Sequence, residues 1–483
     1  MLSKNITKVN KIAVVSLLLF AIITITRIIN HVPFIDEAHA WTLAENLGFF
    51  ELINEVKNEG HFFLWQLILF PFAKLHLYPY SMQAINWIFC FIALILFWWK
   101  APFNNVVKIL VTFSFPFLGC YGVIARCYSL GIMFLFLLAI LFDKKLKYPK
   151  TYALLLVLAA NSSVMALIGA SAFGFLFLYD LFKQKQLTKK DNILVGVILS
   201  IGAWLILYQL FNMDYFTQIS SNRRPHISIR VFRNVFAYDN LFVNLSMLAL
   251  LSLPVLKFLW SKKFATFFFS YTYFLLLAFT TAVYGGYFWH SYFFYIYLII
   301  TLWLSYNPEN KELIQKLAVG ALGVVAFILI FHGPTKSEHF WVFEGVGVKA
   351  KKFLAIVQAD EVLRNAQIIQ NDGLLQEVRP YFLKHNLKIR THCSNTVVSD
   401  YSLINGDNKF CLVKRTIEQA KKEPETIKKI VESSPLPTYT YVDTVDYVTD
   451  RTFYNFPNNG YSIYIEKYKC YDRYCFWKVE VRR

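Results

Sequence analysis

Long apolar segments recur along the first two thirds of the 483-residue chain, and they constrain its fold more than any other feature. A helix needs about 20 apolar residues to cross the roughly 30 Å hydrocarbon core of a bilayer. The composition agrees with repeated crossings, because 56% of the residues are hydrophobic and 18% are aromatic. These features exclude an ordinary soluble domain and predict an α-helical polytopic membrane protein.

Lysine clusters predict the orientation of these segments, because cytoplasmic loops carry an excess of Lys and Arg. Lys4, Lys8 and Lys11 place the N-terminus inside. The first apolar segment lacks a small-residue cleavage site, so we expect a retained helix rather than a cleaved signal peptide. Four further basic clusters follow along the chain, at 144–150, 183–190, 257–263 and 311–316.

All of these clusters become cytoplasmic if about 11 helices cross the membrane. We place the crossings at 12–30, 81–99, 106–123, 128–142, 151–161, 164–182, 192–211, 240–258, 264–283, 291–306 and 317–333. The segment 61–77 is then a helix lying in the outer membrane face, where Lys74 and His76 suit an interfacial position. The chain leaves the membrane outward, so residues 334–483 are expected to form an extracytoplasmic domain.

The C-terminal segment differs in kind, because its apolar density is lower and strand-like runs alternate with helical ones. This pattern predicts a small α/β domain. The expected strands are Ala366–Gln370, Leu387–Thr391, Lys409–Lys414, Tyr461–Tyr468 and Phe476–Val481, and the expected helices are Val346–Arg364, Leu374–His385 and Thr416–Glu432. Disulfides are expected in this extracytoplasmic domain among Cys393, Cys411, Cys470 and Cys475. Cys470–Cys475 would close a short loop, although four cysteines allow three pairings.

An acidic segment, residues 31–60, follows the first apolar segment of a chain whose net charge is +18. Asp36 and Glu37 lie near its start, where a carboxylate beside the bilayer could take a proton from a hydroxyl. Residues 38–48 predict a short helix, which Asp36 could simply cap. A cap explains one carboxylate but not the pair, so Asp36 and Glu37 are candidate catalytic residues. His39 could orient Asp36 or be only an interfacial side chain.

Other polar side chains are expected at the outer ends of helices. Glu59 and His61 begin the interfacial helix, although they could be an ordinary helix-terminal cluster. Arg126, at a helix junction, could grip a lipid phosphate in bidentate fashion or merely snorkel to headgroups. His290 lies among aromatic residues that could stack on sugar or prenyl groups, or form an interfacial belt.

The loop 212–239 is basic even though it is expected outside. Its core, SSNRRPHISIRVFRN, contains no acidic residue to pair with Arg223 and Arg224. The simplest compensating group is a phosphate or pyrophosphate, and the alternative is an anionic lipid headgroup.

Three short motifs together resemble those of the GT-C integral-membrane glycosyltransferases. They are the Asp36-Glu37 pair after the first helix, E-G-H-F-F-L-W at 59–65, and A-R-C-Y-S-L at 125–130, which contains Tyr128. Within that superfamily the chain is similar to bacterial members related to the lipid A aminoarabinose transferases and the protein O-mannosyltransferases. The resemblance covers most of residues 12–333 in arrangement, but only these motifs at the residue level.

The chain departs from related sequences at two places. They often have H-P-P or H-P-A where this chain has His61-Phe62-Phe63, and an Arg-His pair where it has Trp289-His290. The second departure removes one phosphate ligand and leaves the basic loop to supply it. The candidate substrate-binding residues are His39, Glu59, His61, Arg126, Tyr128, Arg223, Arg224 and His290.

The resemblance implies transfer of a sugar from a polyprenyl-phosphate carrier at the outer face of the cytoplasmic (inner) membrane. The implied partners are a lipid-linked sugar donor, membrane lipid and a glycan, lipid or protein acceptor, with no nucleic acid. Asp36 matches the acidic catalytic position, Glu37 its neighbour and Arg126 the outer-loop arginine. The implied reaction is an inverting displacement, with Asp36 as base and arginines stabilising the lipid phosphate. The acidic pair could hold a divalent metal, but nothing in the sequence requires one.

Two other functions compete with this interpretation. A flippase or transporter of lipid-linked sugars could use the same basic loop without bond chemistry. Against it, no row of charged residues lies mid-helix to line a path. An O-antigen polymerase or ligase also depends on lipid carriers, but an acidic pair after the first helix does not mark those enzymes.

Overall fold

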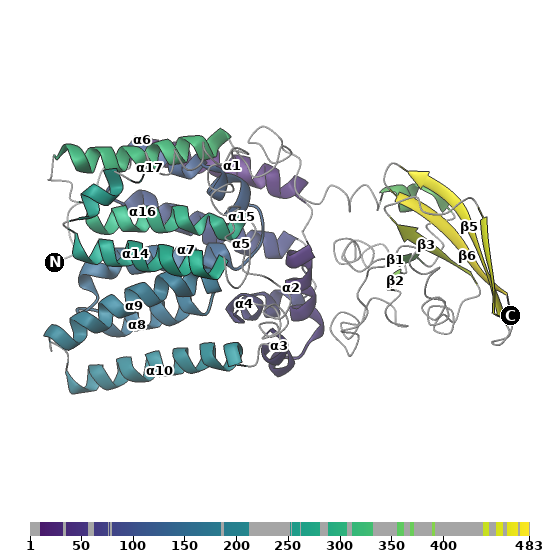
Figure 1. Ribbon diagram of the computed structural model, residues 1–483, viewed down its shortest axis with the longest axis horizontal. Helices are drawn as coiled ribbons and strands as arrows, with labels where there is room; N and C mark the ends of the chain where they lie inside the picture. Colours follow the sequence, from purple (N-terminus) through teal and green to yellow (C-terminus); the bar gives the residue numbers. More distant parts are fainter. Residues whose placement is uncertain are drawn as a thin grey trace. The chain divides into compact units, whose positions relative to one another are not determined.

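The computed structural model in Figure 1 describes residues 10–31, 35–56, 62–75, 77, 80–184, 188–211, 252, 254–260, 262–280, 288–306, 312–331, 355–361, 368–370, 389–391, 438–443, 451–456, 461–471 and 474–482. The chain divides into two compact units. The first comprises Met1–Asn30, Phe49–Phe72 and Tyr80–Gly345. The second comprises His31–Gly48, Ala73–Pro79 and Val346–Arg483, so the acidic pair and the C-terminal segment belong to the same unit.

The first unit is helical, and its long helices run beside one another (Figure 1). Its helices are α1 (Lys11–Asn30), α3 (Phe49–Val56), α4 (Leu64–Lys74, ending in the second unit), α5 (Tyr80–Lys100), α6 (Asn105–Phe113), α7 (Tyr128–Leu141), α8 (Pro149–Ala160), α9 (Val164–Gln184), α10 (Lys189–Phe211), α14 (Lys263–Ala278), α15 (Phe288–Ser291), α16 (Phe293–Ser305) and α17 (Leu313–Phe331). A π-helical segment, η2 (Pro116–Tyr121), and a 3-10 turn, η3 (Phe142–Lys144), complete it.

Six helices within the described residues are long and apolar enough to cross a membrane, by length and composition. They are Lys11–Ile29, Ser81–Lys100, Val164–Lys183, Lys189–Leu210, Phe288–Ser305 and Leu313–Phe331. These helices confirm the expected class, an α-helical membrane protein. The larger number of crossings stays a prediction, and most of the segment 240–258 lies outside the described residues.

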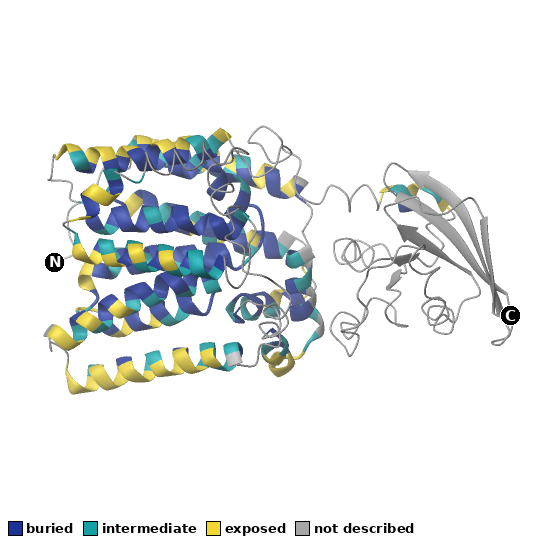
Figure 2. Ribbon diagram, viewed as in Figure 1, coloured by how far each residue is buried: buried dark blue, intermediate teal, exposed yellow. Residues whose placement is uncertain are grey.

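Burial separates central helices from peripheral ones (Figure 2). In the span Phe288–Ser305, 83% of the residues are buried, against 17% of the apolar 18-residue window within Lys189–Leu210. Beyond its first turn, α10 exposes mostly apolar side chains, among them Ile193, Val197 and Trp204. Since water would oppose such a surface, α10 presents the kind of face that lipid covers, whereas α16 lies in the protein core.

Two ion pairs bring helix ends together within the first unit. Lys145, after α7, lies 2.8 Å from Asp180 near the end of α9. Lys150, in the first turn of α8, lies 2.7 Å from Asp191 in the first turn of α10. The basic clusters 144–150 and 183–190 therefore gather at one end of these helices, as the predicted orientation requires.

The single helix expected over 106–123 is interrupted. α6 ends at Phe113, and the chain resumes as η2, whose first residue is Pro116. Proline lacks the N–H that would continue the helical ladder, and its ring clashes with the preceding turn. The ring of Phe115 then packs on Gly119, where an added Cβ would lie 2.4 Å from it. The interruption therefore places the backbone carbonyl of Tyr121 at the end of η2.

The segment 61–77, expected to lie along the membrane, contains the 11-residue helix α4. At a rise of 1.5 Å per residue, such a helix extends roughly 17 Å, about half of the hydrocarbon core. Because α8 (Pro149–Ala160), at the predicted crossing 151–161, is only one residue longer, the placement of segment 61–77 stays a prediction.

The second unit contains α2 (Ile35–Asn46) and a six-stranded sheet. The strands are β1 (Ile368–Gln370), β2 (Ile389–Thr391), β3 (Thr438–Asp443), β4 (Arg451–Phe456), β5 (Tyr461–Tyr471) and β6 (Tyr474–Arg482), in the order β2-β1-β3-β6-β5-β4. β1 pairs in parallel with β2 and β3, and the remaining pairs are antiparallel.

Four of the predicted strands overlap β1, β2, β5 and β6, whereas β3 and β4 were not predicted. The strand expected at Lys409–Lys414 lies outside the described residues, as do the helices Leu374–His385 and Thr416–Glu432 and most of Val346–Arg364. The sheet supports the β half of the expected α/β domain.

Candidate functional site

A buried tyrosine–histidine pair joins two distant segments of the first unit. The hydroxyl of Tyr128, in the first turn of α7, lies 2.8 Å from Nε2 of His290 in α15. The two rings meet edge to face with centroids 5.4 Å apart. Their exposed fractions are only 2% and 5%. The pair therefore fixes the orientation of both rings.

Arg126 lies beside this pair. Its guanidinium carbon is 5.9 Å from the centroid of the Tyr128 ring, within the range of a cation–π contact. Arg126 is partly exposed, whereas Tyr128 and His290 are buried. A cation, a phenol and an imidazole thus meet in one place, which we call the Arg126–Tyr128–His290 cluster.

Tyr121 holds the surrounding elements in place. Its backbone carbonyl, at the end of η2, accepts hydrogen bonds from Nδ2 of Asn86 at 2.9 Å and from the hydroxyl of Ser129 at 2.7 Å. Carbonyls at helix ends lack a helical partner, and these two side chains supply one. The Tyr121 hydroxyl donates to the backbone carbonyl of Trp289 at 2.7 Å. Tyr121 therefore links α5, η2, α7 and α15.

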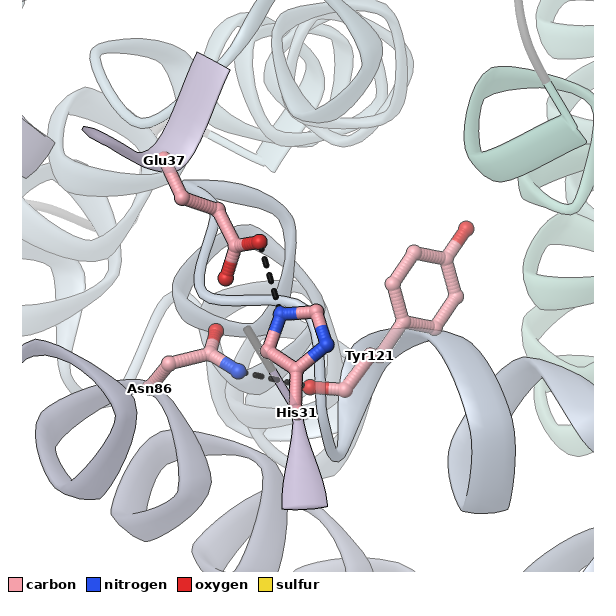
Figure 3. A network of polar contacts seen from close by, with 4 residues as sticks. All are labelled: His31, Glu37, Asn86 and Tyr121. Carbon is pink, nitrogen blue, oxygen red and sulfur yellow. Dashed lines mark hydrogen bonds and ion pairs between the residues drawn. The ribbon is translucent and has the colours of Figure 1, made fainter. Parts of the chain in front are cut away.

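The second group of polar residues lies in the second unit. Nε2 of His31 is 2.8 Å from Oε2 of Glu37, and both side chains are almost completely buried, at 1% and 0% exposed. Figure 3 shows the carboxylate facing one ring nitrogen of His31, with the other nitrogen on the far side of the ring. The figure also shows the Asn86 amide directed at the Tyr121 carbonyl.

The α2 helix positions the acidic pair. Asp36 and Glu37 both lie in its first turn, since the helix begins at Ile35. Asp36 is therefore inside the helix rather than in the capping position considered from the sequence, although its charge still suits the positive end of the helix dipole. At the other end, Nζ of Lys74 donates to the backbone carbonyl of Glu45 at 2.7 Å. A cation there complements the negative end of the dipole.

The predicted site residues fall into three groups. Arg126, Tyr128 and His290 are brought together in the first unit. Asp36, Glu37 and His39 share the first half of α2 in the second unit. The remaining candidates, Glu59, His61, Arg223 and Arg224, lie outside the described residues.

Sequence reasoning did not single out His31, Tyr121 or Asn86. For His31 a signal was present, because it opens the acidic segment and Pro33 lies between it and Glu37. Proline favours a turn, which could return the chain toward the histidine. Nothing in the sequence distinguished Tyr121 from the other aromatic residues of the apolar segments.

The acidic pair does not fit a divalent cation on its own. Such ions require several oxygen ligands, and one carboxylate oxygen of Glu37 faces His31. In the part of the chain that the structure describes, no three His, Cys, Asp or Glu side chains gather as metal ligands. Within the described residues the structure therefore identifies neither Asp36 nor Glu37 as a metal ligand.

These features define an α-helical membrane protein with a buried imidazole–carboxylate pair in one unit and a cationic, aromatic cluster in the other. No protein-family model matches the chain, and no curated protein or solved structure shows significant similarity to it. The residues themselves therefore carry the functional argument.

Proposed function

We propose that the protein is a glycosyltransferase of the cytoplasmic membrane. It takes a sugar from a polyprenyl-phosphate donor and transfers it to an acceptor at the outer face. About 11 crossings and an extracytoplasmic C-terminal α/β domain belong to this proposal. The helices able to cross a membrane support it, because a lipid-borne donor must be reached at the bilayer.

The observation that carries the proposal is the Arg126–Tyr128–His290 cluster. The leaving group of the reaction is a lipid phosphate, which gains negative charge as the sugar departs. A guanidinium stabilises such charge through paired hydrogen bonds. The hydrogen bond between Tyr128 and His290 holds the imidazole in a fixed orientation, so little reorganisation is required during the reaction.

The acidic pair is the candidate group for removing the proton, on the chemistry of these carboxylates in the second unit. An acceptor hydroxyl must lose its proton as it attacks the anomeric carbon. The carboxylates in the first turn of α2, Asp36 and Glu37, can assist this proton removal. The leaving phosphate is already ionised, so the reaction needs no strong general acid.

The proposal is tested with the full-length protein in nanodiscs, using a panel of synthetic polyprenyl-phosphate sugars. The acceptor is an envelope fraction from a deletion strain, and free polyprenyl phosphate is measured by mass spectrometry. The wild type should release polyprenyl phosphate from at least one donor. Arg126→Gln should lower kcat/KM for that donor by about tenfold, the loss of one charge-assisted contact that strengthens as the phosphate leaves.

Lys100→Gln is a matched control. Its ammonium also lies 5.9 Å from an aromatic ring, that of the exposed Trp99, away from the cluster. The control should leave kcat/KM for the donor unchanged. Movement of the donor across the bilayer of sealed proteoliposomes, without release of polyprenyl phosphate, would instead establish a transporter.

A further inference from the structure

The His31–Glu37 pair has the geometry of an oriented base. A carboxylate 2.8 Å from Nε2 of the ring can only accept a hydrogen bond when it is ionised. Nε2 of the neutral imidazole therefore carries the proton, and Nδ1 carries the lone pair. Glu37 selects this tautomer and holds the plane of the ring, as second partners do for many functional histidines.

The second nitrogen of this ring points to a missing partner. Nδ1 of His31 is buried, and within the described part of the chain no protein atom forms a hydrogen bond with it. Leaving a buried polar atom unpaired is costly, so such atoms usually meet a protein group, a water molecule or a ligand. Nδ1 in this tautomer is an acceptor, and the group that satisfies it must donate an O–H or N–H.

We propose that His31 is the catalytic base of the transfer reaction and that Glu37 is its positioning residue. This inference rests on the proposed glycosyltransferase function, and it replaces Asp36 as the group that receives the proton. In water an imidazole is a stronger base than a carboxylate by roughly a hundredfold. A base of that strength removes a hydroxyl proton more effectively near neutral pH.

The step balances without a further reactant. The acceptor O–H bond breaks, and its proton passes to Nδ1 of His31. The acceptor oxygen forms a bond to the anomeric carbon of the sugar. The bond from that carbon to the phosphate oxygen breaks, and its electron pair leaves with the polyprenyl phosphate. The imidazolium, stabilised by Glu37, then returns its proton to water.

Chemical rescue distinguishes His31 from Asp36. His31→Ala should lower kcat by at least about 100-fold while leaving donor KM unchanged. Added imidazole should raise the kcat of this variant by at least about tenfold. Asp36→Ala is the matched variant from the same segment, and imidazole should not restore its activity. Rescue of Asp36→Ala, but not of His31→Ala, would overturn the proposal and leave the glycosyltransferase function intact.

Two further variants distinguish loss of the base from misfolding of the protein. His31→Gln keeps an N–H donor for Glu37 but offers no basic nitrogen, so it should be folded and inactive without rescue. Glu37→Gln should lower kcat less than His31→Ala does, and adding Glu37→Gln to His31→Ala should cause little further loss. A folded His31→Gln protein with wild-type turnover would also overturn the proposal.

The state of the His31 ring can be measured without any donor. Solid-state NMR of histidine-labelled protein, with His31→Gln to assign the signal, should show the Nε2–H tautomer in the wild type. A loss of that preference is expected in Glu37→Gln. If no donor is ever consumed but this tautomer is found, the proposed function fails while the pairing stands. Activity that EDTA abolishes and Mn²⁺ restores would make Glu37 a metal ligand and overturn the inference.

Discussion

The hydroxyl of Tyr128 lies 2.8 Å from Nε2 of His290, although the two residues are 162 positions apart. This hydrogen bond connects the start of α7 to α15, and Tyr121 reinforces it through the carbonyl of Trp289. Arg126, two residues before Tyr128, lies over the ring whose hydroxyl makes this hydrogen bond. The cluster is a product of packing between helices rather than of any local motif.

Tyr128→Phe should raise donor KM and lower stability by about 1 kcal/mol, because it removes one buried hydrogen bond. Thermal unfolding in detergent and donor titration measure the two effects. Tyr152→Phe is the matched control, since the buried Tyr152 hydroxyl has no hydrogen-bond partner within the described residues. That change should not destabilise the protein. Equal losses in both variants would contradict the role assigned to Tyr128.

Breaking the Lys145–Asp180 ion pair should be among the most destabilising changes in the first unit. Both side chains are about nine-tenths buried, and Nζ of Lys145 also donates to the carbonyl of Phe142 at 3.1 Å. Asp180→Leu leaves a buried ammonium without its counterion, which typically costs about 3–5 kcal/mol. The double variant Lys145→Met/Asp180→Leu should recover much of that loss in thermal unfolding. No recovery would show that the pair's charge is required for another reason.

Substitutions of two amide side chains on α5 should change the stability of the protein in opposite directions. Both amide atoms of the buried Gln83 lack a partner within the described residues, so Gln83→Met should stabilise the ligand-free protein by about 1 kcal/mol. Asn86 donates to the Tyr121 carbonyl, so Asn86→Leu should destabilise it by a similar amount, about 1 kcal/mol. Thermal unfolding without donor measures both. A destabilised Gln83→Met protein would indicate a structural water or ligand at this amide.

The register of β5 and β6 places Cys470 directly opposite Cys475. Residues opposite one another in an antiparallel pair have Cα atoms about 4.5–5.5 Å apart, which suits a disulfide. We expect non-reducing peptide mapping to recover these two cysteines as a linked pair. Replacing both with Ser should destabilise the C-terminal domain by about 2 kcal/mol, because the bridge closes only a short loop. Free thiols at both positions would refute the expected bridge.

The orientation prediction is tested by reporter fusions. A reporter after Lys150 or Lys190 should be cytoplasmic, because both positions lie in lysine clusters. The Lys150–Asp191 ion pair requires the two reporters to share one compartment. A reporter after Thr335 should be external. Opposite compartments for the first two fusions would contradict the ion pair, and an internal Thr335 fusion would reverse the placement of the C-terminal domain.

The sequence by itself determined the class of the protein and the elements that depend on local pattern. Apolar runs predict helices in a membrane protein because, in lipid, the backbone N–H and C=O groups of each run must form hydrogen bonds with one another. Four strands of the sheet were predicted for a similar reason, since alternating apolar residues suit a pleated surface. β3 and β4 were not predicted, although their runs TYTYVD and RTFYNF contain the aromatic and β-branched residues that favour strands.

Only the tertiary structure decided which polar groups meet. The break at Pro116 could have been suspected from the sequence, but the contacts it creates through Tyr121 could not. The same holds for His31, whose ring nitrogen lies 2.8 Å from a carboxylate oxygen of Glu37. Hydrogen bonds between distant residues depend on how helices and loops pack in three dimensions. A linear pattern records each residue's own preference, but not the partner that packing brings to it.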